Sequence, residues 1–142
     1  MKTNENVNIC KGVAEELEKY VNGEYFRCPE CGDVFTWDDV EVKGDECYYC
    51  PHCDEMFLDG DLEQLSVYDW LEDVLEIEYR CNSRKEYRSA SVMTACGGPT
   101  IYVDTGSKQV ELYWWTERAN YPISADAAAA LDDCLEEHWN CL

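Results

Sequence analysis

Residues 27–35 read Arg-Cys-Pro-Glu-Cys-Gly-Asp-Val-Phe, and residues 49–57 read Tyr-Cys-Pro-His-Cys-Asp-Glu-Met-Phe. The second segment repeats the first at an offset of 22 residues, with a C-P-x-C turn and a Phe four residues after its second Cys. A C-x2-C turn presents two thiolates, and zinc takes four ligands at the corners of a tetrahedron. The full spacing, C-x2-C-x18-C-x2-C, is typical of a zinc site. The four predicted ligands are Cys28, Cys31, Cys50 and Cys53.

Two alternatives stay open at this site. Cys47 and Cys50 have the same spacing as a ligand pair, but Cys50 and Cys53 are preferred because they repeat the first turn together with its Pro. Iron is the alternative metal. His52 lies between two predicted ligands and is expected to be an exposed turn residue.

Over residues 25–58 the two C-P-x-C turns resemble the zinc-ribbon superfamily. The resemblance implies a structural zinc site in which protein fills all four positions, and therefore no catalysis at the metal. Phe35 and Phe57 are expected to cover the cluster. Rubredoxins use similar turns for iron, usually with a longer gap between them. Zinc ribbons occur in many kinds of protein, so the resemblance names no function.

The rest of the chain is predicted to be an α+β fold. Apolar residues at helical spacing predict helices over 10–22, from Ser66 onward, and over about 125–139. Alternating patterns predict a four-stranded antiparallel meander, with strands at 77–82, 87–95, 100–104 and 109–115. The predicted parts are an N-terminal helix (1–24), the zinc ribbon (25–58) and an α+β domain (59–142), which begins at the linker turn Asp59-Gly60-Asp61.

The cysteines and the N-terminus bear on the compartment. No apolar h-region marks a signal peptide near Met1, and no run of eighteen apolar residues exists, so we expect a cytoplasmic protein with no membrane span. In that reducing compartment cysteines serve metals or packing rather than disulfides. The remaining cysteines are expected to pack as small hydrophobes: Cys10, Cys81, Cys96, Cys134 and Cys141.

Charge is the other strong signal. The chain of 142 residues holds 31 Asp and Glu against 11 Lys and Arg, a net charge of −20, while 46% apolar and 13% aromatic residues exclude a disordered acidic tail. Residues 28–78 alone contain 17 acids and one base. Such a chain is a poor direct binder of nucleic acid or of anionic membranes, and it fits basic surfaces on other proteins.

The acids fall into rows. Asp69, Glu72, Asp73 and Glu76 follow i, i+3, i+4, i+7, so they are expected to share one helix face, and the last helix presents a second patch. The second patch consists of Asp132, Asp133, Glu136 and Glu137. The alternative to a binding surface is a solvated face. Mimicry of nucleic-acid phosphates would also need the ribbon acids on the same surface: Asp38, Asp39, Glu41, Asp45 and Glu46.

Two further features concern partners. One group of basic residues interrupts the acidic chain: Arg80, Arg84, Lys85 and Arg88. We expect this group to pair with the acidic helix or with a second subunit, so a homodimer is one of the two interpretations. Residues 113–115 read Tyr-Trp-Trp, and alternation on a strand turns one of these side chains outward. Packing beneath a helix and an interface anchor at Trp115 are the two interpretations.

Two segments, 95–105 and 112–118, give the chain a resemblance to small acidic proteins of phages and conjugative elements of Gram-positive bacteria. They read Ala-Cys-Gly-Gly-Pro-Thr-Ile-Tyr-Val-Asp-Thr and Leu-Tyr-Trp-Trp-Thr-Glu-Arg. The resemblance implies an inhibitor of host defence, of the anti-CRISPR or antirestriction type, acting on a nuclease or CRISPR effector in the host cytoplasm. The alternative is a zinc-ribbon adaptor in transcription or DNA transfer. No enzyme is expected, since only a Cys96–His138 pair offers a candidate nucleophile and base.

Overall fold

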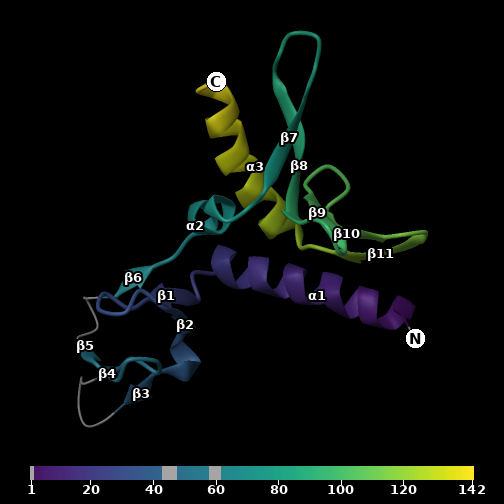
Figure 1. The fold of residues 1–142 in the computed structure, drawn as a ribbon. Helices are drawn as coiled ribbons and strands as arrows, with labels where there is room; N and C mark the ends of the chain where they lie inside the picture. The colour runs from purple at the N-terminus through teal and green to yellow at the C-terminus, as the bar shows by residue number, and fades with distance from the viewer. Residues whose placement is uncertain (1, 43–47, 58–61) are drawn as a thin grey trace.

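The computed structural model describes residues 2–42, 48–57 and 62–142. Its largest part is a five-stranded antiparallel sheet with three helices, which confirms the α+β class (Figure 1). The strands follow chain order across the sheet: β7 (Glu76–Cys81), β8 (Tyr87–Ala95), β9 (Thr100–Asp104), β10 (Gln109–Trp114) and β11 (Glu117–Pro122). The helices are α1 (Lys2–Val21), α2 (Val67–Glu72) and α3 (Ala125–Asn140). None of the helices in this described part has the length and apolarity needed to cross a membrane.

The main core lies between one face of this sheet and the helices. Alternation along the strands buries Val92, Val103, Val110 and Leu112, all fully, on that face. Helix α1 packs against β10 and β11, and α3 packs against β8. The opposite face of the sheet carries polar and aromatic side chains, as an antiparallel sheet with one solvated face does.

The predicted four-stranded meander is wrong by one strand. Strands β7 to β10 lie within a residue of their predicted bounds, but β11 pairs with β10 along its whole length. In its sequence, Glu-Arg-Ala-Asn-Tyr-Pro, Ala119 is buried, and Glu117 and Tyr121 are half-buried. Because no Val, Ile or Phe marks the strand, its alternation was too weak to predict it.

The predicted helix face at residues 69–76 is also wrong. Helix α2 ends at Glu72, Asp73 is its C-cap, and Glu76 is the first residue of β7. Asp69 and Glu72 are therefore the only acids of that row within the helix. The start of α1 differs too, since it begins at Lys2 rather than near residue 10.

The cysteine motifs lie in a separate small unit, which we call the cysteine module (described residues 25–42 and 48–57). It contains β1 (Tyr25–Arg27), β2 (Val34–Thr36), a short 3-10 helix (Trp37–Asp39), β3 (Glu41–Val42), β4 (Tyr48–Tyr49) and β5 (Met56–Phe57). Strand β6 (Glu63–Gln64) pairs with β1, and Gln64 donates a hydrogen bond to the carbonyl of Gly23 at 2.8 Å. Figure 1 shows the module beyond the C-terminal end of α1, away from the five-stranded sheet.

Several predictions fall outside the described residues. They concern Cys47, the acids Asp45 and Glu46, and the linker turn at 59–61.

Candidate functional site

The four predicted ligands come together in one cluster. One sulfur from each of Cys28, Cys31, Cys50 and Cys53 lies within 4.8 Å of all the others. The Sγ atoms of Cys28 and Cys53 are 3.7 Å apart, as are those of Cys31 and Cys50. Zinc–sulfur bonds of about 2.3 Å in a tetrahedron separate the sulfurs by about 3.8 Å. The cluster therefore has the ligand set and dimensions that a zinc ion requires.

The two turns that carry the cysteines have the same backbone structure. In the first turn the N–H of Gly32 donates to the carbonyl of Cys28 at 3.0 Å, and in the second Asp54 donates to Cys50, also at 3.0 Å. Gly32 and Asp54 both have left-handed backbones, with φ of 75° and 64°. The 22-residue sequence repeat is thus a structural repeat, and each copy delivers two sulfurs to the same point.

The environment has opposite effects on the acidity of Cys28 and Cys31. Burial opposes ionisation of Cys28, but hydrogen bonds from the backbone N–H groups of Cys31 and Glu30 and from neighbouring thiols lower the pKa of Cys28 to about 7. At Cys31 a backbone hydrogen bond from Asp33 favours the thiolate, yet desolvation and the neighbouring thiols raise the pKa to about 12. A metal must therefore displace protons from the cluster, so its affinity falls as the pH falls.

Phenylalanines cover the cluster as predicted. Phe35 and Phe57 are buried beside Cys28 and Cys50, with ring centroids 6.2 Å apart. His52 is exposed, also as predicted.

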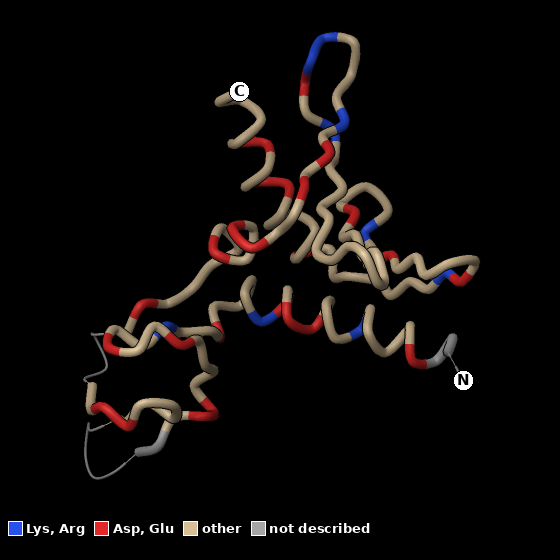
Figure 2. The backbone as a smooth tube through the Cα atoms, in the orientation of Figure 1, with Lys and Arg blue, Asp and Glu red and all other residues tan. Residues whose placement is uncertain are grey.

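The acids of α3 form the best-defined carboxylate surface. Asp132, Asp133, Glu136 and Glu137 lie on the side of α3 opposite its buried residues, and in the described part of the chain none of them has an ion-pair partner. We call these four residues the α3 carboxylate face. Figure 2 shows its acids along α3.

Tyrosines mark both edges of the α3 carboxylate face. The hydroxyl of Tyr87, on β8, donates to Asp132 at 2.6 Å, and that of Tyr68, on α2, donates to Glu137. Burial and the bond to Asp132 raise the pKa of Tyr87, and the bond to Glu137 raises the pKa of Tyr68. Both tyrosines therefore stay protonated donors and hold the edge carboxylates in place.

The other predicted acids have different surroundings. Asp69 accepts the backbone N–H of Ser66 at 2.7 Å and so caps α2. Glu72, Asp73 and Glu76 are exposed. Tyr68 joins α2 to α3, but Asp69 and Asp73 lie near Tyr20 of α1 and contribute to its raised pKa. These acids therefore do not form the single row that the sequence predicted. Asp38 and Asp39 lie in the cysteine module (Figure 2).

The basic residues around the β7–β8 hairpin also separate. Arg80 pairs with the nearly buried Asp104 of β9 through two hydrogen bonds, at 2.6 and 3.1 Å, rather than with the acidic helix. Burial opposes ionisation of Asp104, but these bonds lower its pKa. Arg84, Lys85 and Arg88 are exposed at the hairpin, with no ion pair among the described residues, and Figure 2 shows blue at its tip.

The two tryptophans near the end of β10 differ in burial. Trp114 is half-buried and packs against the main core. Trp115 lies in the turn between β10 and β11 and is 89% exposed. Packing in the core therefore applies to Trp114, whereas Trp115 and, at 39% exposure, Tyr113 point outward.

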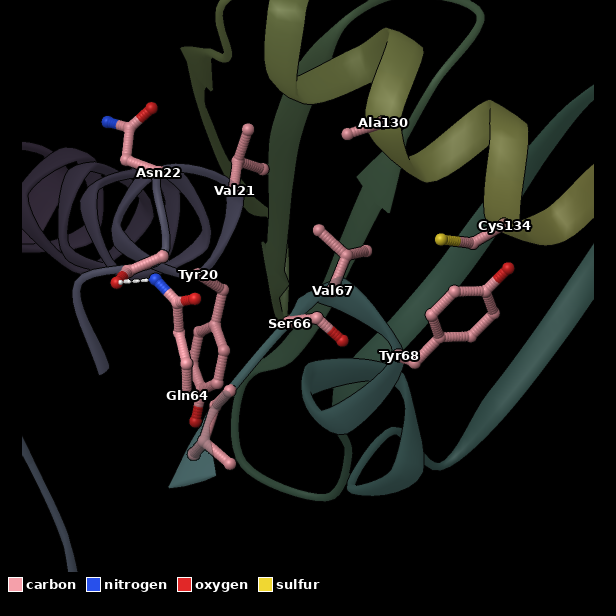
Figure 3. A pocket seen from close by; sticks show the side chains of 11 residues that line it. Tyr20, Val21, Asn22, Gln64, Ser66, Val67, Tyr68, Ala130 and Cys134 are labelled. Atoms are coloured by element: carbon pink, nitrogen blue, oxygen red, sulfur yellow. Dashed lines mark hydrogen bonds between the residues drawn. The ribbon is translucent and has the colours of Figure 1, made fainter. Parts of the chain in front are cut away.

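Sequence reasoning missed a pocket of about 430 Å³ that lies between the C-terminal end of α1, β6, the start of α2 and α3 (Figure 3). Tyr20, Val67, Tyr68, Ala130 and Cys134 line it. Burial raises the pKa of Cys134, so this thiol stays protonated and unreactive.

The two residues of the candidate catalytic pair, Cys96 and His138, lie in different elements. Cys96 is exposed in the turn between β8 and β9, while His138 hydrogen-bonds with the hydroxyl of Tyr79.

No family model, curated protein or solved structure matches this chain. The similarity to acidic mobile-element proteins and to zinc ribbons stays a prediction from the sequence.

Proposed function

We propose that this chain is an acidic inhibitor that binds the basic nucleic-acid-binding surface of another protein, such as a defence nuclease or a CRISPR effector. The observation that carries the proposal is the α3 carboxylate face. Like charges at helical spacing repel one another, each pair by a few tenths of a kcal/mol. Four such charges without a described basic partner, on a helix whose other side is buried, are well placed to meet Lys and Arg of another protein.

The tyrosines at the edges of the face support the same role. Tyr68 and Tyr87 hold Glu137 and Asp132 in fixed positions before any partner binds, which reduces the side-chain ordering that association requires. Attraction between opposite charges also speeds encounter and weakens with salt. A zinc ion on the four cysteines would stabilise the cysteine module.

The test compares two variants with the same change of charge. The α3 variant combines D132N, D133N, E136Q and E137Q, whose amide oxygens still accept the tyrosine hydrogen bonds. The control variant combines E5Q, E15Q, E16Q and E24Q, all exposed and in or just after α1. A tagged wild-type chain is used to capture partners from a DNase-treated bacterial lysate, and the captured protein is then purified.

Affinities for the purified partner decide the outcome. We expect wild-type binding to weaken steeply with salt, heparin to compete for it, and the α3 variant to lose about tenfold or more. The control variant should bind within about threefold of wild type, because surface changes outside an interface have small effects. Undiminished binding by the α3 variant would contradict the proposal.

The adaptor function is favoured by one observation on the cysteine module. Val34, Trp37 and Met56 are large apolar side chains that the module leaves 38%, 39% and 55% exposed. If the module makes the contact, the variant E30A/H52A with M56A should lose the partner while keeping its metal. The α3 variant would then bind normally, and the captured protein would be RNA polymerase or a DNA-transfer protein.

A further inference from the structure

The turn between β10 and β11 places a bulky residue where the backbone disfavours one. Trp114 pairs with Glu117, so Trp115 and Thr116 form a two-residue hairpin turn. Trp115 has φ of 56°, in the left-handed region that turns of this length normally fill with Gly, Asn or Asp. Among the described non-glycine residues with positive φ, Trp115 is the aromatic one.

The side chain of Trp115 gains little burial in return for this conformation. The side chain of Trp115 is 89% exposed, and its recorded ring contact is with Trp114, at 6.2 Å between centroids. A glycine here would remove both the backbone strain and the exposed indole. Strained residues that persist on a surface concentrate at functional sites, and exposed tryptophans are frequent anchors of protein interfaces.

A hollow of about 280 Å³ lies beside the indole. Its walls are the turn Gly97-Gly98-Pro99-Thr100 and the rings of Tyr113, Trp114 and Trp115. At Gly98 a Cβ atom would come within 3.3 Å of the Trp114 ring, so glycine permits the close approach that forms this wall. The same surface therefore presents an exposed indole next to a hollow lined by aromatic rings and a Gly-Pro turn.

The charge of this surface sets it apart from the rest of the chain. Residues 96–100 are uncharged, and residues 113–120 contain one acid, Glu117, and one base, Arg118. The guanidinium of Arg118 lies 5.7 Å from the centroid of the Tyr113 ring. In a chain with a net charge of −20, this patch carries no net charge, so two copies that meet there add no like-charge repulsion at the contact itself.

We propose that this surface (residues 97–100 and 113–118) binds a second copy of the chain across a two-fold axis. Each Trp115 indole enters the hollow of the other copy, against Pro99 and Trp114, and Glu117 of each copy faces Arg118 of the other. A projection and a complementary hollow on one patch are what a two-fold interface requires. Aromatic rings in such a contact attract beyond the area that they bury.

The dimer has a salt dependence opposite to that of the proposed inhibitor contact. Salt screens the repulsion between two chains of charge −20 but leaves apolar contacts intact, so self-association strengthens as salt rises. The dimer does not depend on the proposed function. Neutralising the α3 carboxylate face should leave dimerisation unchanged or strengthen it.

Sedimentation velocity over a concentration series tests the proposal, at low salt and at about 0.5 M NaCl, where the Debye length is well below 10 Å. A reducing agent prevents disulfides through the exposed cysteines Cys31, Cys81, Cys96 and Cys141. We expect wild type to dimerise reversibly, W115A and W115G to weaken dimerisation about tenfold or more, and L75A to match wild type. Leu75 is a suitable control because it is 60% exposed and lies outside the patch.

Thermal unfolding separates an interface role from a structural one, and is measured at concentrations where every variant is monomeric. W115A should unfold at nearly the temperature of wild type because the ring is exposed, and W115G should be more stable than W115A because glycine tolerates the positive φ. A wild-type chain that stays monomeric at high salt, or a W115A chain that still dimerises, would overturn the proposal. So would a large loss of stability in W115A.

Discussion

The cysteine module and the five-stranded sheet domain are held together by different means. In the main body eighteen buried apolar residues form one core between the sheet and the helices. In the cysteine module the buried cluster consists of Cys28, Phe35, Cys50 and Phe57. Two of these four residues, Cys28 and Cys50, are themselves predicted metal ligands. The module's described strands are two or three residues long. Apolar burial contributes little in a unit this small, and a metal held by the four cysteines would supply the missing stability.

The largest expected effect is loss of the module on removal of its metal. Structural zinc contributes on the order of 10 kcal/mol or more to folding of small zinc domains. We expect a chelator, or the variant C28S, to collapse the amide NMR signals of residues 25–36 while those of Val92 and Val103 stay dispersed. Metal analysis of wild type should find one zinc per chain.

The matched control is C141S, which removes an exposed cysteine outside the cluster. It should keep the full metal content and all amide signals. Module signals that remain dispersed in the metal-free chain would show that the apolar cluster is enough to fold the module without a metal.

The second prediction concerns the apolar core of the main body. Leu112 of β10 is fully buried, so L112A should lower the free energy of unfolding of the main body by about 2–5 kcal/mol. Zinc content should not change, because the cysteine cluster shares no buried residue with the main core. The control L75A, at a 60% exposed position, should cost less than about 0.5 kcal/mol in the same denaturant titration. Loss of zinc from L112A would mean that the two units fold as one.

The cysteine cluster and the central strands of the sheet were predictable from the sequence, each for a physical reason. The metal cluster was predictable residue by residue because a coordination sphere fixes ligand type and spacing, and Cys28, Cys31, Cys50 and Cys53 meet as expected. Strands β8 and β9 were predictable because Val, Ile and Ala alternate with polar residues. Strand β11 was not, since its inward residues, Glu117, Ala119 and Tyr121, include no Val, Ile, Leu or Phe.

Other features depend on contacts that no local pattern encodes. The row of acids at 69–76 has perfect helical spacing, yet the chain leaves the helix after Glu72 to join the sheet beside β8. The positive φ of Trp115 follows from hairpin register, which is set by pairing of Trp114 with Glu117. The ion pair of Arg80 with Asp104 joins β7 to β9 across the sheet, and spacing gave no sign of it.

The third prediction concerns that ion pair. Asp104 is only 7% exposed and has a pKa below its usual value. Its ionised form therefore stabilises the fold at every pH above about 4. This contribution is lost as the pH falls through the lowered pKa. At pH 7, D104N should therefore cost about 1–3 kcal/mol, the range for hydrogen bonds to charged groups. The difference from wild type should shrink in acid denaturation experiments below about pH 4.

The control for this substitution is E78Q, which makes the same charge change on the same face of the sheet. Glu78 is exposed, and no ion pair of it exists in the described part of the chain. E78Q should change stability by less than about 0.5 kcal/mol at any pH. A constant cost of D104N down to pH 2 would exclude the ionic explanation and point to side-chain shape instead.

The smallest expected effect uses the repeat inside the cysteine module. Gly32 and Asp54 occupy equivalent left-handed positions, and a Cβ added at Gly32 would meet nothing within 4 Å. The cost of G32A is therefore purely conformational, about 1 kcal/mol, and should appear as a roughly fivefold weaker zinc affinity in a competition titration. D54G should act in the opposite direction and by less, because glycine relieves the strain but loses more entropy on folding.

The same Gly→Ala substitution in the main body should have the opposite effect on stability. Gly12 lies inside α1, where an added Cβ also meets nothing within 4 Å, so G12A should stabilise the main body by about 0.5–1 kcal/mol without altering zinc affinity. Both glycines have open space around them, and only the backbone conformation differs. If G32A and G12A changed stability in the same direction, the left-handed turn would not limit the module, and the equivalence of the two cysteine turns would lose its physical basis.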